Sequence, residues 1–351
     1  MSFSEPCALA VDFGGTSIKM GVTAGDRILA TADRIPTTMF ESPQAIIDAM
    51  VATALVLREQ FPTACVMGMG MPGWCDYYKG VLYQLTNVKV WDHEIPVKEM
   101  MERAVGLPVV LDNDANCMAY AEWKLGAGRG MSSLVCLTMG TGIGGGIVLQ
   151  DRILRGRRFS AAEVGQTSIH YQGKTGPFGN RGAIEEYIGN NELAAEAVRR
   201  YTGAGIDKTV DECTPRDLDV AARAGCPVAL QLWEDTAEIL ACLIMNLMYT
   251  LVPDAFIIGA VWPRQGFVDE ATVGEPQKQL FPLLMEDLKI LPARFGAEAG
   301  LLGAGAMAMD EFMGWGFWNG LRIRNQRRLL LVWANIGLAM PERQAYKRNR
   351  S

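Results

Sequence analysis

The sequence contains no uninterrupted apolar run near the ~20 residues that a membrane span requires, so we expect no transmembrane helix. Its first residues, MSFSEPCALAVDF, lack the basic region and long apolar core of a signal peptide, which predicts a cytoplasmic protein. The eight cysteines include no C-x-x-C pair, and several stand in apolar runs. This pattern is typical of free, buried thiols in a reducing compartment.

Positive charge and histidine are also scarce. The net charge of −6 argues against a nucleic-acid partner. The only histidines are His93 and His170, and the sequence offers no histidine-based catalytic triad. The one basic stretch is residues 319–351, with eight Lys or Arg and a single acid, Glu342. We interpret this tail as a packed terminal helix or an extension without a role in activity, in preference to a basic amphipathic membrane anchor.

What is present is the composition of an ordinary globular protein, with 351 residues, 49% of them hydrophobic, and room for two domains. Three short strands over residues 7–35 precede alternating helices and strands, and a similar order restarts at 133. We therefore expect an α/β fold with two halves of the same element order and a cleft between them. The helices expected with clear signals lie at about 43–60, 190–202, 215–224, 226–250 and 276–290.

Residues 9–22, LAVDFGGTSIKMGV, read as strand, glycine turn, strand. Gly14 and Gly15 would let the backbone approach a ligand closely, and successive N–H groups in such a turn can bind an anion. Thr16 adds a hydroxyl and Lys19 a positive charge, while Asp12 is a candidate partner for Mg²⁺. The alternative is a plain β-hairpin with a glycine turn.

The stretch SLVCLTMGTGIGGGIVLQ, residues 133–150, repeats this pattern with five glycines in residues 140–146. Glycine between apolar strands is costly, and a close backbone contact usually explains it. A strand follows the glycines, which excludes a Rossmann fingerprint, and no G-K-[ST] closes a Walker A motif. We predict a second phosphate-binding hairpin; the alternative is a tight sheet corner.

Between the hairpins lies LDNDAN, residues 111–116, where a strand ends and a helix begins. Asp112, Asn113 and Asp114 could each cap that helix. α/β proteins also place their chemistry at this position. A carboxylate here could take the proton from an attacking hydroxyl group during phosphoryl transfer.

Seven motifs in order resemble the ROK family of bacterial sugar kinases and related repressors over about residues 8–308: VDFGGTSIKMGV, LDNDANCMAYAEWKLGAG, LTMGTGIGGGIVL, AAEVGQ, GNRGAIEEYIG, PDAFIIGAV and GLLGAGAMA. The resemblance implies the actin-like ATPase (ribonuclease H-like) fold and a homodimer. It also implies a small lobe of residues 1–121, completed by a helix at about 300–313. Residues 122–299 would form a large lobe, and 319–351 an extension of unknown role.

The resemblance also implies a role for each matching residue. Asp114 would be the catalytic base in an ATP- and Mg²⁺-dependent phosphorylation of a hexose, glucose first, at its 6-hydroxyl. The sugar would be bound by Asn87, Asn113, Glu163, Gln166 and Glu185. Adenosine would rest near Gly259, and Mg²⁺ would lie near Asp12. The phosphates would contact Gly14, Gly15 and Thr16 of the first hairpin, and Gly140, Thr141, Gly142 and Gly144 of the second.

The chain also departs from the family pattern. Gln166 stands where the family usually has histidine, and it can hydrogen-bond to a sugar but cannot titrate. Gly176, Phe178 and Ala183 stand where a zinc site usually has cysteines, so we predict no structural zinc. We expect packing of Phe178 and Tyr171 to hold the 166–183 loop instead.

Several other functions remain open at this point. A repressor of this family needs an N-terminal helix-turn-helix, but the first phosphate strand already begins at Ala8, which leaves no room for one. A non-catalytic sugar sensor conflicts with the presence of Asp114, Glu163 and Glu185. An actin-like chaperone or filament ATPase has no use for these sugar-matching residues. A kinase for another hexose or an N-acetyl amino sugar differs from a glucose kinase by one substituent.

Overall fold

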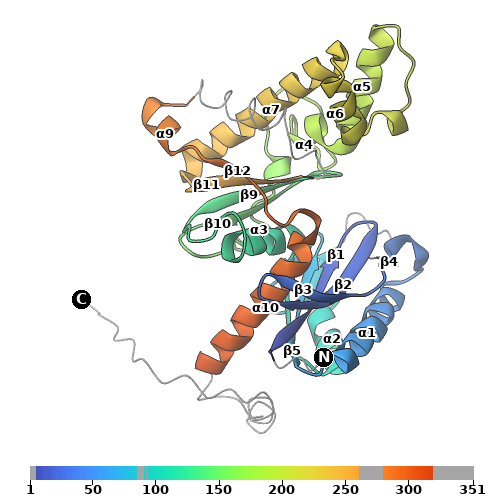
Figure 1. Cartoon of the computed structure of the whole chain (residues 1–351), viewed down its shortest axis with the longest axis vertical. Coiled ribbons are helices and arrows are strands. Elements are labelled where there is room, and N and C mark those ends of the chain that lie inside the picture. Colours follow the sequence, from blue (N-terminus) through green and yellow to red (C-terminus); the bar gives the residue numbers. More distant parts are fainter. Residues whose placement is uncertain (1–4, 85–90, 92, 261–279, 319–351) are drawn as a thin grey trace.

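The computed structural model describes residues 5–84, 91, 93–260 and 280–318 (Figure 1). The sugar-binding residue predicted at Asn87 and the basic tail at 319–351 lie outside the described residues. Two main sheets lie one above the other in Figure 1, with helices α3 (Asp114–Lys124) and α10 (Ala299–Trp318) between them. Asp114 is the first residue of α3, and Asp12 lies against the first turn of α10.

The first sheet has the order β3-β2-β1-β5-β8, with the short β4 paired to β2. β1, β2 and β3 form an antiparallel meander, whereas β1, β5 and β8 run parallel. Helices α1 and α2 cover one face, and α10 packs on the other. The bounds are β1 (Cys7–Phe13), β2 (Ser17–Ala24), β3 (Arg27–Thr31), β4 (Ile35–Pro36), α1 (Pro43–Gln60), β5 (Ala64–Met71), α2 (Val97–Val105) and β8 (Val109–Asn113).

Local signals explain where the first helices begin and end. The Ser42 hydroxyl accepts the N–H of Ala45 at 3.2 Å, and Pro43 follows at the first helical position, as expected from the sequence. Gly106 ends α2 in a left-handed conformation, with φ of 72°. A two-stranded ribbon of β6 (Trp74–Asp76) and β7 (Val81–Gln84) extends beside this sheet.

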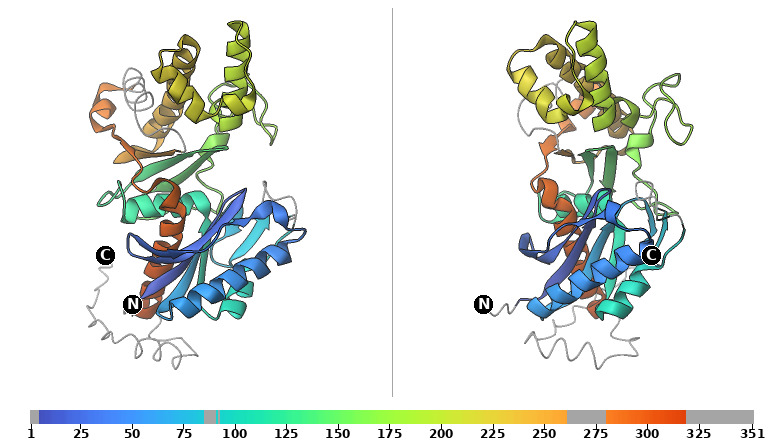
Figure 2. Two further views of the ribbon diagram at one scale, coloured as in Figure 1. Left: turned by 45° about the vertical axis from the view of Figure 1, so that its right-hand side comes forward. Right: turned by 90° about the vertical axis from the view of Figure 1, so that its right-hand side faces the viewer.

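The second sheet has the order β10-β9-β11-β12, and it repeats the pattern of an antiparallel hairpin followed by parallel strands. This confirms the duplicated element order. α3 packs on β9 and β10. On the other side of the sheet, the helices α4, α5 and α6 pack against α7 (Figures 1 and 2). The bounds are β9 (Leu134–Met139), β10 (Ile143–Val148), α4 (Glu185–Ile188), α5 (Asn190–Gly203), α6 (Pro215–Arg223), α7 (Pro227–Leu251), β11 (Ala255–Ala260), α9 (Pro282–Asp287) and β12 (Ile290–Pro292). Short 3₁₀ helices lie at Thr37–Met39, Val164–Gln166, Val210–Glu212 and Gly296–Glu298.

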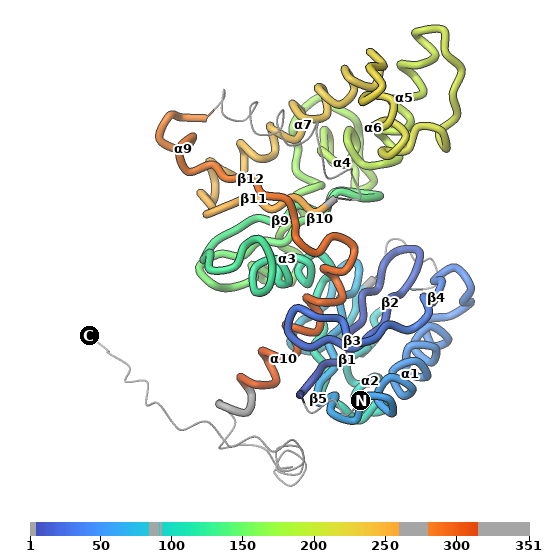
Figure 3. Tube along the Cα trace, viewed as in Figure 1, coloured from blue at the N-terminus to red at the C-terminus, as the bar shows by residue number. Residues whose placement is uncertain are grey.

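The helices α10 and α3 pack closely against each other (Figure 3). At Gly303 a Cβ atom would lie only 1.7 Å from the carbonyl oxygen of Cys117. Only glycine fits there, because any side chain would push the two helices apart. This contact fixes α3, and therefore the residues at its N-terminus, between the two sheets.

One expected helix is much shorter than the sequence suggested. The apolar spacing over 276–290 predicted one continuous helix, but among the described residues only Pro282–Asp287 is α-helical. Pro282 occupies the first helical position. Ile290 then pairs with Phe256 of β11 and becomes the edge strand β12, so sheet pairing replaces the last helical turn. In the part of the chain that is described, no helix is long and apolar enough to cross a membrane.

Candidate active site

Three parallel strands bring the predicted carboxylates to one edge of the first sheet. Asp12 of β1 pairs in register with Gly70 of β5, and Gly70 pairs with Asp112 of β8. A Cβ atom at Gly70 would lie 3.5 Å from the Cα of Asp114, which is the first residue of α3. The carboxyl ends of parallel strands are where α/β folds bind ligands, and Asp114 lies there as predicted.

The first turn of α3 also contacts the second sheet. A Cβ atom at Gly144 of β10 would lie 3.6 Å from the Cβ of Ala115, and one at Gly146 would lie 2.5 Å from the Cβ of Ala119. Gly146 therefore lets the helix press against the strand, whereas a Cβ atom at Gly144 would clash with the hydroxyl oxygen of Thr138 in the paired strand β9, 2.4 Å away. Asp114 lies between the end of β5 in one sheet and the beginning of β10 in the other.

Electrostatics make Asp114 the most perturbed acid of this edge. Its pKa is raised to about 7: burial is the largest cause, the charges of Asp12 and Glu163 act in the same direction, and the hydrogen bond from Ala115 N–H acts in the opposite direction. A carboxyl group with a pKa near neutrality can accept and release a proton at physiological pH, which is the property of a general base.

Asn113 serves as the N-cap of α3. Its Oδ1 accepts the N–H of Asn116 at 3.2 Å, and its Nδ2 donates to the carbonyl of Gly73 at 3.2 Å. The capping interpretation of LDNDAN is confirmed for this residue, and the same contacts hold the amide beside Asp114. The remaining hydrogen and lone pair of the amide stay available for a ligand.

The tip of the first hairpin is held by Ser17 of β2 and by Thr37, which begins the 3₁₀ helix after β4. Gly14 N–H donates to the carbonyl of Ser17 at 3.0 Å, and the Thr37 hydroxyl donates to the carbonyl of Gly15 at 2.8 Å. The Thr37 N–H donates to the carbonyl of Thr16 at 3.1 Å, while the Thr16 side chain is exposed. The turn is therefore rigid and leaves its threonine free to meet a ligand.

Lys19 and Asp12 form an ion pair at 2.8 Å at the base of the first hairpin. Lys19 Nζ also donates to the carbonyl of Ala297, just before α10. At Gly300, in the first turn of α10, a Cβ atom would lie 2.6 Å from the carboxyl carbon of Asp12. The carboxylate thus sits against the N-terminus of a helix, whose dipole favours negative charge.

A glutamate holds the tip of the second hairpin. Ile143 N–H donates to Oε2 of Glu185 at 2.8 Å, and a Cβ atom at Gly142 would lie 2.3 Å from the same oxygen. At Gly140, in contrast, a Cβ atom would meet nothing within 4 Å, and Thr141 is exposed. Of the predicted phosphate-binding residues of this hairpin, Gly140 and Thr141 lie at the open tip, Gly142 faces Glu185, and Gly144 lies under α3.

The predicted sugar-binding residues occupy the segment after β10 and the start of α4. Glu185 accepts a hydrogen bond from Gln166 Nε2 at 3.0 Å, so one carboxylate joins the hairpin tip to this segment. Partial desolvation raises the pKa of Glu163; a hydrogen bond from Trp74 lowers it, and the charge of Glu185 raises it. Trp74 is 46% exposed.

Trp74 is a residue of this site that the sequence analysis missed. It belongs to β6, beside the first sheet, yet its indole reaches Glu163 in the segment that follows β10. The sequence signal that could have identified it is an aromatic residue directly after the Pro-Gly turn that ends the buried strand β5. Its half-exposed ring offers an apolar face next to a carboxylate, a common arrangement around a sugar ring.

The expectation that Phe178 and Tyr171 hold the 166–183 loop is wrong, because these side chains are 60% and 79% exposed. Hydrogen bonds hold the loop instead. Asn180 Nδ2 donates to the backbone carbonyl of Gln166 at 3.0 Å and to its Oε1 at 3.2 Å. At the far end, Lys174 donates to the carbonyl of Glu186 at 2.8 Å.

The residues present do not fit a zinc ion at this loop. Gly176, Phe178 and Ala183 carry no ligand atom in their side chains, and His170 is exposed on the surface. Within the described ranges, no three His, Cys, Asp or Glu side chains are arranged to hold a metal. The absence of structural zinc stays a prediction.

Asp12 does fit Mg²⁺ of the kind that accompanies a nucleotide. Such an ion is usually bound by one or two carboxylates, by waters and by phosphate oxygens, and a single carboxylate at the base of a phosphate-binding turn supplies the protein's part.

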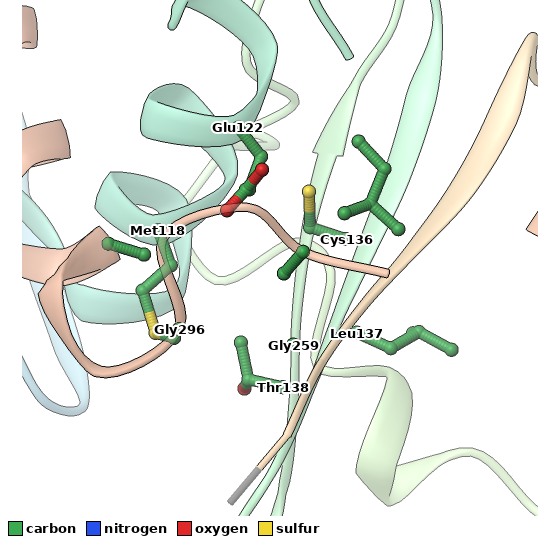
Figure 4. A pocket seen from close by; sticks show the side chains of 10 residues that line it. Met118, Glu122, Cys136, Leu137, Thr138, Gly259 and Gly296 are labelled. Carbon is green, nitrogen blue, oxygen red and sulfur yellow. The ribbon is translucent and has the colours of Figure 1, made fainter. Parts of the chain in front are cut away.

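Gly259 of β11 lines a small pocket between the second sheet and the helices α3 and α10 (Figure 4). It pairs in register with Thr138 of β9, and Met118, Glu122 and Gly296 close the other side. Gly259 therefore lies one strand away from the second hairpin. The predicted phosphate and adenosine positions are thus neighbours in the same sheet.

The ROK family model matches residues 8–311 of the chain. A glucokinase of Streptomyces coelicolor is 31% identical over 318 residues, which cover 86% of this chain and 97% of that protein. A ROK family glucokinase from Streptomyces griseus, solved with glucose and AMPPNP, has a TM-score of 0.71 at 31% identity and covers 87% of this chain and 99% of its own. A ROK hexokinase from Thermus thermophilus has a TM-score of 0.74 at 30% identity, with 88% and 99% covered.

Proposed function

Because this chain belongs to the ROK family and has its actin-like ATPase fold, we propose that it is a sugar kinase that phosphorylates a hexose at the 6-hydroxyl, with glucose as the first candidate. The observation that carries the proposal is the position of Asp114 between the end of β5 and the beginning of β10, with a pKa of about 7. The similarity to glucokinases over most of both chains supports the sugar class.

ATP is the proposed phosphoryl donor, in line with the AMPPNP complex of the Streptomyces griseus relative. Its phosphates would lie on the backbone N–H groups of the two turns, at Gly14–Thr16 and at Gly140–Gly142, with the Thr16 and Thr141 hydroxyls beside them. Adenosine would lie toward Gly259. Mg²⁺, held near Asp12, would neutralise phosphate charge. Asp12 and Lys19 already face each other there at 2.8 Å.

The sugar would lie where several hydrogen-bond acceptors converge. Asn113 is fixed by its cap, Glu163 by Trp74, and Gln166 by Glu185 and Asn180. Carboxylates and amides can bind the ring hydroxyls by several hydrogen bonds at once, which distinguishes a sugar from water. Asn87 stays a prediction as a further sugar ligand.

In the proposed reaction, the deprotonated carboxylate of Asp114 accepts the proton of the 6-hydroxyl as this oxygen attacks the γ-phosphorus. The bond from the γ-phosphorus to the bridging oxygen breaks, and ADP leaves with the electron pair. Orientation and a late proton acceptor suffice when the transition state is loose. A base with a pKa near 7 is ionised for much of the time at neutral pH.

We also propose that the two sheets belong to separate lobes. Residues 1–121 with the helix at about 300–313 would form one lobe, and residues 122–299 the other. The proposed boundary falls within α3, which packs on the second sheet and on α10. Closure of the lobes would exclude water from the reaction.

The test is sugar-dependent ADP release measured against a panel of hexoses and N-acetyl amino sugars. We expect Asp114→Asn to lower turnover by about a thousandfold or more while sugar binding, measured by calorimetry, persists. Asp48→Asn, on the exposed face of α1, is the control and should leave turnover unchanged. Sugar binding without any ADP release by the wild-type protein would indicate a sensor instead of a kinase.

A further inference from the structure

A buried ion pair lies directly behind the proposed base. Arg155 Nε donates to Oδ2 of Asp112 at 2.8 Å, and Nη2 lies 2.7 Å from the same oxygen. Asp112 is 1% exposed, and the Arg155 side chain is 21% exposed. A carboxylate this deeply buried requires a partner, because an uncompensated charge would be strongly destabilising.

The other oxygen of Asp112 shapes the turn between β8 and α3. Oδ1 accepts the backbone N–H of Asn113 at 2.8 Å and the Nδ2 of Asn116 at 3.0 Å. Asn113 in turn caps the helix that begins with Asp114. One carboxylate therefore connects Arg155 to the backbone that places both Asn113 and Asp114.

Arg155 comes from the opposite sheet. It follows the bridge between Val148 and Ile153 and the hydrogen bond from Leu154 N–H to Ile147 O at 2.8 Å, which fix the segment to β10. Its carbonyl accepts the N–H of Ala161 at 3.1 Å, which closes a loop that leads directly to Glu163. Arg155 is thus rigidly linked to the proposed sugar-binding segment.

Two further contacts hold the guanidinium group of Arg155 in place. It lies 3.7 Å from the ring centroid of Tyr77, and Nη2 lies 3.7 Å from the sulfur of Met307 in α10. The Tyr77 hydroxyl donates to Glu311 of α10 at 2.6 Å. The Arg155 side chain therefore joins four parts of the chain: β8, the turn after β6, α10 and the segment after β10. These contacts leave it little freedom to move.

We propose that Arg155 is a positioning residue for the base: it fixes the β8–α3 turn through Asp112 and cancels the Asp112 charge behind Asp114. This inference deepens the proposed function and rests on Asp114 being its base. Other titratable groups among the described residues also act on Asp114 or lie beside it. The groups that face this region are Asp12, paired with Lys19, then Glu163, and the buried thiols of Cys75 and Cys117, whose raised pKa values keep them neutral.

Removing Arg155 would leave Asp112 as an uncompensated negative charge two residues from Asp114. That charge would favour the protonated form of the base. The turn would also lose the anchor of Oδ2, and a displacement of the base by about 1 Å can cost about a hundredfold in rate. Binding of the sugar would be affected less, because Glu163, Gln166 and Glu185 keep their own partners.

The experiment compares the wild type with Arg155→Gln, the conservative Arg155→Lys, and the exposed neighbour Arg157→Gln as the matched control. For Arg155→Gln we expect kcat to fall at least about tenfold, with the sugar KM changed less than about threefold. The acid limb of kcat/KM should shift upward by about 0.5 to 1 pH unit. Arg155→Lys should restore the limb but only part of kcat, because lysine supplies the charge without the planar guanidinium. Arg157→Gln should match the wild type.

A second measurement does not depend on kinase activity. In protein labelled with ¹³C at the aspartate carboxyl, the Asp114 signal is assigned by its loss in Asp114→Asn, and its titration is compared between wild type and Arg155→Gln. An upward shift of the midpoint supports the proposal, even if no hexose proves to be a substrate. An unmoved midpoint overturns it, as does a kcat within about twofold of the wild type.

Arg155→Gln buries a lone carboxylate, which disfavours folding, so a second variant serves as a check. The pair Asp112→Asn with Arg155→Gln keeps the hydrogen-bonding groups and buries no net charge. In this double variant the titration midpoint of Asp114 should return to within about 0.3 units of the wild type. A midpoint that stays shifted in the double variant overturns the role of the Asp112 charge.

Discussion

The two glycine hairpins look alike in sequence but are held in different ways. At the β1–β2 turn, the contacts come from neutral groups, chiefly the backbone and hydroxyl of Thr37 in the 3₁₀ helix that follows β4. At the β9–β10 turn, the carboxylate of Glu185 accepts the N–H of Ile143, and Asn190 N–H donates to the carbonyl of Gly140 at 3.1 Å. The second turn is therefore attached to helices α4 and α5.

This difference places the two turns in different networks. Glu185 also accepts from Gln166, so the second hairpin shares a side chain with the proposed sugar-binding segment. The charged pair of the first hairpin, Asp12 and Lys19, contacts the segment before α10 instead. We infer that a disturbance of the second turn reaches both substrates, whereas a disturbance of the first reaches the nucleotide alone.

The sharpest test of this comparison is Gly142→Ala against Gly14→Ala. The new Cβ at Gly142 would lie 2.3 Å from Glu185, whereas at Gly14 it would lie 3.1 Å from the Ser17 carbonyl. We expect Gly142→Ala to lower kcat/KM about a hundredfold for both sugar and ATP, and Gly14→Ala about tenfold for ATP alone. Steady-state kinetics with each substrate varied measures this. Gly203→Ala, where a Cβ meets nothing within 4 Å, is the control. Equal patterns in the two hairpin variants would contradict the comparison.

The pH dependence provides a second test. Asp114 must be ionised to accept a proton, and its pKa is about 7, so kcat/KM for the sugar should fall about tenfold per unit below pH 7 and level off above it. Asp12 of the first hairpin raises this pKa, so in Asp12→Asn the limb should move to lower pH, whatever the height of the profile. If the acid limb of the pH profile does not move, the charge of Asp12 does not influence the pKa of Asp114.

The same shift has a consequence for stability. The pKa of Asp114 in the folded protein is raised from the ordinary value of 3.8 to about 7, so the folded state binds more protons than the unfolded state in that interval. Its contribution to stability therefore falls as pH rises from about 4 through 7. At pH 8, Asp114→Asn should melt a few degrees (about 2–4 °C) above the wild type. Thermal unfolding followed by circular dichroism checks this; a lower melting temperature would contradict it.

A smaller effect is expected at the loop that joins the second hairpin to the sugar-binding segment. Asn180→Ala removes both hydrogen bonds to Gln166, each worth about 1 kcal/mol, and should raise the sugar KM by about tenfold with the ATP KM unchanged. Phe178→Ala, at an exposed position of the same loop, should change neither constant. The reverse result would restore the aromatic residues as the elements that hold the loop.

The smallest effect concerns Ala162, which has a φ of 69° and packs its carbonyl against Gly145 of β10. A left-handed backbone conformation costs alanine about 1 kcal/mol. Glycine avoids this cost but loses a similar amount of conformational entropy on folding. Ala162→Gly should therefore be as stable as the wild type or slightly more so, whereas Ala161→Gly should lose about 0.5–1 kcal/mol. Urea unfolding of the two variants measures the difference. An equal loss of unfolding free energy in both would show that the backbone at Ala162 is not strained.

The sequence analysis succeeded where the signals are local. Both hairpins were predicted because strand, glycine turn and strand follow one another within about 20 residues, and the cap of α3 was predicted from LDNDAN alone. It failed where partners are distant. Trp74 and Glu163 stand far apart in the chain, and nothing in either neighbourhood predicts the other. The phosphate contact proposed for Gly144 stays a prediction, and its position beside Ala115 at the start of α3 could not be read from the sequence.

By itself, the sequence determined the two glycine turns, the strand that ends just before Asp114, the charge balance and the lack of cysteines at Gly176, Phe178 and Ala183, because each depends on residue type and short spacing. Only the tertiary structure decided that Glu185 binds a turn 42 residues earlier, that Gln166 and Asn180 fasten the sugar-side loop, and that Arg155 faces Asp112. The pKa of Asp114 belongs to this second group as well. Burial and neighbouring charges set it, and both arise only when the two sheets close around α3.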